Sequence, residues 1–65
     1  MKIEKGASDL FIIEIARDDL RIINNCINDA IDLISSKEFG TRVGATLEEA
    51  EALLDIIQGA LRKVE

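Results

Sequence analysis

Few side chains in this sequence could perform chemistry, and Cys26 is the first to consider. It is the single cysteine, and the sequence contains no histidine. A thiol becomes a good nucleophile when a neighbouring base or cation lowers its pKa. Cys26 instead falls among apolar positions of an expected helix, where an unpaired cysteine behaves as a small hydrophobic residue. We therefore interpret Cys26 as a packing residue.

Acidic side chains form three groups that could bind a divalent cation or exchange protons. None of the groups has the spacing of a calcium-binding loop. Two of them lie where a helix is expected to begin, and carboxylates stabilise the exposed amides there. We interpret all three as capping and surface groups, so the sequence predicts no metal site, no cofactor and no enzyme activity. The groups are Asp18 with Asp19, Asp29 with Asp32, and Glu48 and Glu49 with Glu51.

The segment 35–45 holds the best candidate for a binding site, because it combines an aromatic residue, an arginine and two glycines. Amides at the start of the following helix could bind an anion beside Arg42. However, the order Thr46-Leu-Glu-Glu49 predicts a capping box that already uses those amides. The alternative is that the segment is a glycine loop whose apolar residues close the end of the helical region. The candidate interaction loop comprises Glu38, Phe39, Thr41, Arg42 and Gly44.

Two helices, about 18–35 and 46–64, are expected to position these residues as an antiparallel helical hairpin. Apolar residues cover almost half of each helix, whereas one partner helix covers a stripe of roughly 100°. The expected contact between the helices joins Leu20, Ile23, Ile27 and Ile34 to Leu47, Leu54, Ile57 and Leu61. The apolar residues outside this contact should face the N-terminal strand or another chain. They form the candidate oligomer interface, which comprises Ile22, Cys26, Leu33 and Ile56.

The N-terminal region carries a short strand-like segment. Residues 10–16 contain three isoleucines and a phenylalanine, which favours a strand, although a helix continuing into residue 18 is the alternative. Residues 1–9 lack periodicity and are expected to be a loosely ordered tail. The remaining residues, 10–65, are expected to form one small domain, so the predicted fold is mainly α with a strand-like start.

Length and charge limit the possible partners. A chain of 65 residues buries only about 60% of its unfolded surface, so its own core provides limited stability. A single cysteine cannot form a disulfide within the chain, which leaves association with a partner chain as the source of further stability. Thirteen acidic and eight basic residues give a net charge of −5, which disfavours nucleic acid and anionic membranes. The start of the chain does not resemble a signal peptide, so a cytoplasmic location is expected, with assembly as a dimer or larger helical oligomer.

Two stretches of the chain resemble small bacterial proteins of unknown function. Those proteins carry an "LNNALNE"-like helix and an "EFxTRxGxxxEEAxxLL" segment, and the resemblance covers roughly residues 19–58. The matching stretches read I-I-N-N-C-I-N-D-A from residue 22 and E-F-G-T-R-V-G-A-T-L-E-E-A-E-A-L-L from residue 38. The resemblance implies no activity, but it implies that residues 38–44 form a recurrent motif. This chain departs from the pattern at Cys26, where such proteins have alanine.

Two classes of function fit these observations. The first is a small non-catalytic protein-interaction module, of the adaptor or immunity type, that acts as a homo-oligomer. The second is a ribbon-helix-helix-like DNA-binding regulator, because a strand followed by two helices is that architecture. A DNA-binding ribbon must present polar side chains to base edges, and residues 10–16 offer mainly apolar ones. The sequence therefore favours the interaction module.

Overall fold

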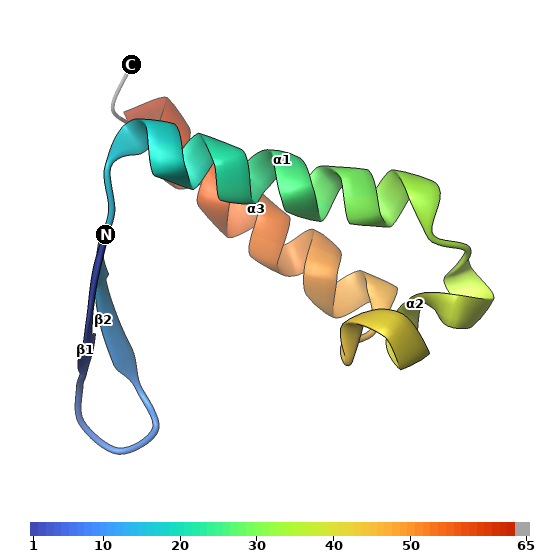
Figure 1. Ribbon diagram of the computed structural model, residues 1–65, viewed down its shortest axis with the longest axis horizontal. Coiled ribbons are helices and arrows are strands. Elements are labelled where there is room, and N and C mark those ends of the chain that lie inside the picture. Colours follow the sequence, from blue (N-terminus) through green and yellow to red (C-terminus); the bar gives the residue numbers. More distant parts are fainter. Residues whose placement is uncertain (64–65) are drawn as a thin grey trace.

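The computed structural model describes residues 1–63 as a β-hairpin followed by three helices (Figure 1). The expectation of a mainly helical chain with a strand near its N-terminus is confirmed. In chain order the elements are β1 (Lys2–Lys5), β2 (Phe11–Glu14), α1 (Arg17–Leu33), α2 (Ser36–Val43) and α3 (Leu47–Lys63).

The hairpin pairs β1 with β2 in antiparallel orientation, with Ile3 opposite Ile13 and Lys5 opposite Phe11. The Gly6 amide donates to the Leu10 carbonyl at 2.8 Å, which closes the connecting turn. The predicted strand is thus present in residues 11–14, and β1 provides the hydrogen-bonded partner strand for its backbone. The expectation of a loosely ordered tail over residues 1–9 is wrong, because residues 2–5 form that partner strand.

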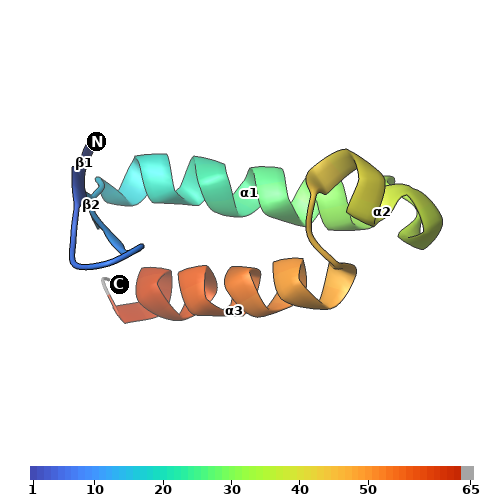
Figure 2. The same ribbon diagram turned by 90° about the horizontal axis from the view of Figure 1, so that it is seen from below.

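Helices α1 and α3 lie antiparallel and side by side (Figure 2). Ala50 and Leu54 are buried, and all of the other residues expected at this contact, Ile23 and Ile27 among them, are half-buried. The predicted helical hairpin is therefore correct, and both bounds of the first helix and the start of the second differ from the predicted ones by one or two residues. The predicted end of the second helix, at residue 64, lies outside the described residues.

The expectation of a glycine loop between the two long helices is wrong, because most of that segment folds as α2. The helix contains Gly40 and is followed by its C-cap, Gly44, whose φ of 79° lies in the left-handed region that glycine adopts without strain. Its one buried side chain is Phe39, which is 1% exposed. Burial of this aromatic ring outweighs the low helix propensity of glycine.

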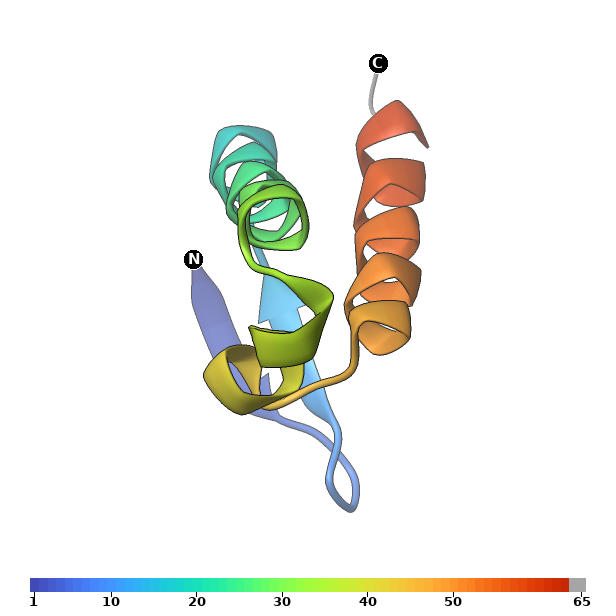
Figure 3. The same ribbon diagram turned by 90° about the vertical axis from the view of Figure 1, so that its right-hand side faces the viewer.

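The hairpin and α2 both lie below α1 in the view of Figure 1, at opposite ends of that helix. Figure 3, which looks along α1, shows α1 and α2 in one layer and α3 beside them. The molecule measures 33 × 32 × 16 Å, and its radius of gyration is 13.2 Å. A compact 65-residue domain would have a radius of gyration of about 11 Å. The hairpin therefore projects from the helical part instead of packing onto it.

Candidate interaction surface

The residues of the predicted interaction loop occupy different environments around α2. Phe39 is buried, and Gly44 forms the C-cap of the helix, where its amide donates to the Gly40 carbonyl at 2.9 Å. Glu38 and Arg42 form an exposed ion pair one helical turn apart, with 3.6 Å between their charged groups. The structure thus assigns Phe39 and Gly44 to the fold and leaves the charged pair on the surface.

The predicted capping box at the start of α3 is confirmed. The Thr46 amide donates to Glu49 Oε1 at 2.9 Å, and the Glu49 amide donates to Thr46 Oγ1 at 3.1 Å. Two contacts with Thr46 hold the pKa of the Glu49 carboxylate below its ordinary value. The hydrogen bond from the Thr46 amide has the larger effect, and the contact with the Thr46 side chain has the smaller one. Because these two amides are already bonded, they are not available to the anion that the segment 35–45 could otherwise have attracted.

An apolar hollow of about 240 Å³ opens beside Phe39, between α1, α2 and α3. Ile27 and Ala30 of α1 line it, together with Val43 of α2 and Leu53 of α3. The lining residues therefore identify the side of α1 and the side of α3 that face the hollow next to α2. Other residues on the same side of each helix follow from helical periodicity.

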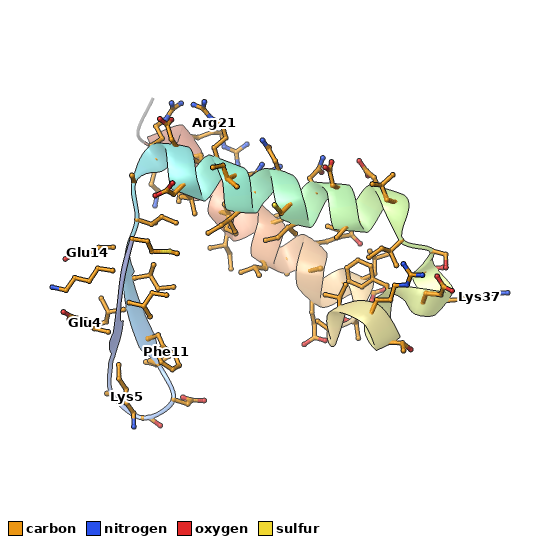
Figure 4. All side chains as sticks on the ribbon, viewed as in Figure 1. Glu4, Lys5, Phe11, Glu14, Arg21 and Lys37 are labelled. Atoms are coloured by element: carbon orange, nitrogen blue, oxygen red, sulfur yellow. The ribbon has the colours of Figure 1, made fainter. Side chains whose placement is uncertain are left out.

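On α1, apolar residues on the side beside the hollow continue from Ile22 to Leu33. Positions 22, 26, 30 and 33 recur every three or four residues and form one row. Arg21 points away on the opposite side of α1 (Figure 4), as expected for a residue half a turn from Ala30. Ile22, Cys26 and Leu33 are all exposed in this row, and Leu33 is 81% exposed. Three of the four predicted interface residues therefore share one open side of α1.

On α3, the corresponding row starts at Leu53, which lines the hollow. Ile56 and Ala60 follow it at three and seven residues, so they lie on the same side of the helix. Ile56 is 70% exposed. The fourth predicted interface residue thus lies on the same side of the helix pair as the row on α1.

The hairpin adds an apolar face that the sequence reasoning missed. Cross-strand neighbours share a face of a hairpin, so Ile3, Phe11 and Ile13 lie together, with Lys5 beside them opposite Phe11. Phe11 points toward the space below α1, whereas Glu4 and Glu14 point away (Figure 4). The face was missed because β1 has only four residues with a single apolar one. The alternation in β2, with Phe11 and Ile13 on one side, was the available signal.

We call these residues together the open apolar surface. They lie on the inner face of the hairpin and on all three helices. Among the exposed large apolar residues that the structure describes, only Met1, Leu10 and Ile12 lie outside it. Its members are Ile3, Phe11, Ile13, Ile22, Cys26, Leu33, Val43, Leu53 and Ile56.

Residues 1–63 contain no group of three or more Cys, Asp or Glu side chains placed to hold a metal ion. Within the same residues, no helix has the length and apolar character needed to cross a membrane. Comparisons with protein-family models, curated proteins and solved structures gave no match. The resemblance to small bacterial proteins therefore stays an expectation.

Proposed function

We propose that this chain is a small, non-catalytic protein-interaction module that acts as a homo-oligomer, in an adaptor or immunity-type role. The observation that carries the proposal is the open apolar surface. Large exposed apolar patches on small proteins commonly mark sites of protein association. The surface combines residues from all three helices and the hairpin, so it is a property of the fold.

The small core of the protomer supports the same proposal. Within residues 1–63, only Phe39, Ala50 and Leu54 are buried apolar residues. Domains of this size gain limited stability from their own core and commonly obtain the remainder by oligomerisation. Covering the open apolar surface would supply that remainder.

Charge favours a protein partner over nucleic acid. The outer face of the hairpin carries Lys2, Glu4 and Glu14, and Lys2 Nζ lies 2.8 Å from Glu4 Oε1. This mixed and largely neutralised face lacks the concentrated positive charge that a DNA backbone attracts. An exposed free thiol at Cys26 is also compatible with a reducing compartment such as the cytoplasm.

Sedimentation equilibrium of the full chain, over protein concentrations from micromolar to millimolar, tests the proposal. We expect the average mass to rise with concentration to that of a dimer or larger oligomer. A monomer mass at every concentration would contradict the proposal. A parallel titration of a DNA duplex at low salt should show no binding, and salt-sensitive binding there would instead support the DNA-binding alternative.

A further inference from the structure

We infer that the open apolar surface is covered by a second copy of this chain, with the hairpin of each protomer lying against α1 and α3 of the other. The inference rests on the proposed self-association and goes beyond it by naming the surfaces that meet. It also assigns the hairpin a role as an arm that exchanges contacts between protomers.

The exposed area of the protomer matches what a dimer needs. Its accessible surface is 5193 Å². A compact monomer of 7.2 kDa would expose about 4,100 Å², which leaves an excess of about 1,100 Å². A stable dimer buries about 800 Å² on each subunit. The protomer therefore exposes surplus area of the size that one copy would cover.

The two halves of the open apolar surface have complementary shapes. The hairpin is a projecting element whose inner face presents three apolar side chains, Ile3, Phe11 and Ile13, beside Lys5. Helices α1 and α3 have 17 residues each and are about 25 Å long, whereas the four-residue strands are about 13 Å long. The helical part is thus long enough to receive a hairpin. Every protomer carries both a hairpin and a helical face. A two-fold axis therefore places each hairpin on the helical face of the other protomer and closes the assembly at two subunits.

The native thiol tests this arrangement without any substitution. Cys26 is exposed in the protomer and lies within the surface that the partner would cover. We expect its reaction rate with an aromatic disulfide reagent to fall in proportion to the dimer fraction, measured by sedimentation on the same samples. If Cys26 reacts as fast in the dimer as it does in dilute, monomeric protein, the inference is overturned while the proposed function stays intact. A monomer at all concentrations would overturn both.

Neighbouring isoleucines on β2 provide a matched pair of variants. Ile13 and Ile12 are 54% and 58% exposed and lie on opposite faces of the hairpin. Ile13→Glu should raise the dimer dissociation constant by about 100-fold, because burial of an isoleucine changes an association constant by more than about tenfold and the dimer holds two copies. Ile12→Glu should change it by less than about threefold. Equal effects of the two variants would overturn the inference.

Complementary charges test the exchange itself. Ile13→Lys on the hairpin and Ile56→Glu on α3 should each abolish the homodimer. When the two variants are mixed, the Lys–Glu pair would occupy one of the two equivalent sites and the other would keep both native isoleucines. We therefore expect the mixture to form a heterodimer in sedimentation. If no heterodimer forms, the hairpin does not meet the partner's α3 and the inference fails.

Discussion

Replacement of Phe39 by alanine should remove most of the stability that holds α2 in place. Phe39 is 1% exposed and is the one buried side chain of that helix. Truncation of a fully buried phenylalanine to alanine costs about 3–5 kcal/mol, and a chain of this length has a total unfolding free energy of about 3–10 kcal/mol. The variant should therefore be marginally stable. Phe39→Leu keeps most of the volume and should cost about 1 kcal/mol.

Val43→Ala provides the control, because Val43 lies on the same helix and is exposed. Urea unfolding followed by far-UV circular dichroism gives the three free energies. All samples should have one dilute protein concentration, because the proposed self-association would add to the apparent stability. Val43→Ala should cost less than about 1 kcal/mol. If Phe39→Ala costs no more than Val43→Ala, the ring does not anchor α2, and the burial argument is refuted.

The further predictions concern the caps, the glycines and the net charge. Thr46→Ala should lower the unfolding free energy by about 1 kcal/mol in urea titrations. Because folding lowers the pKa of Glu49, stability should fall as the pH drops below the ordinary glutamate value and through the lowered one; Glu49→Gln should remove this part of the pH profile. Thermal melts should show that Gly44→Ala destabilises by about 1 kcal/mol, since φ is positive there. In contrast, Gly59→Ala, within α3 and with open space where the added methyl group would lie, should stabilise by up to about 1 kcal/mol. Added salt should tighten the dimer in sedimentation, since it screens repulsion between chains of charge −5.

The long helices could be predicted because their signals are local and repeated. Apolar residues recur at helical spacing through α1 and α3, and the capping box at Thr46 and Glu49 marks the start of α3. The surplus apolar residues could be recognised by the same periodicity. Their common orientation could not, because it depends on how the hairpin and α2 are placed around the helices.

The hairpin partner and α2 escaped prediction for different physical reasons. Strand β1 has the sequence Lys-Ile-Glu-Lys, too short for an alternating pattern, and it is stabilised by pairing with β2 across a turn. Helix α2 contains Gly40 and is followed by Gly44, and two glycines in a short segment normally indicate a loop. Tertiary burial of Phe39 decides the conformation there, and no local pattern reports burial.

The geometry of the hairpin bears on whether the protomer could cover its own apolar surface. Only two residues, Ile15 and Ala16, join β2 to α1, so a rotation there would fold the hairpin back onto the first turns of its own helix. The strands span about 13 Å, whereas Leu33 lies about 24 Å along α1 from Arg17. A folded-back hairpin would therefore leave Leu33 and the neighbouring α2 uncovered. Intramolecular closure would therefore cover part of the open apolar surface at most, and the proposed second copy would cover the rest.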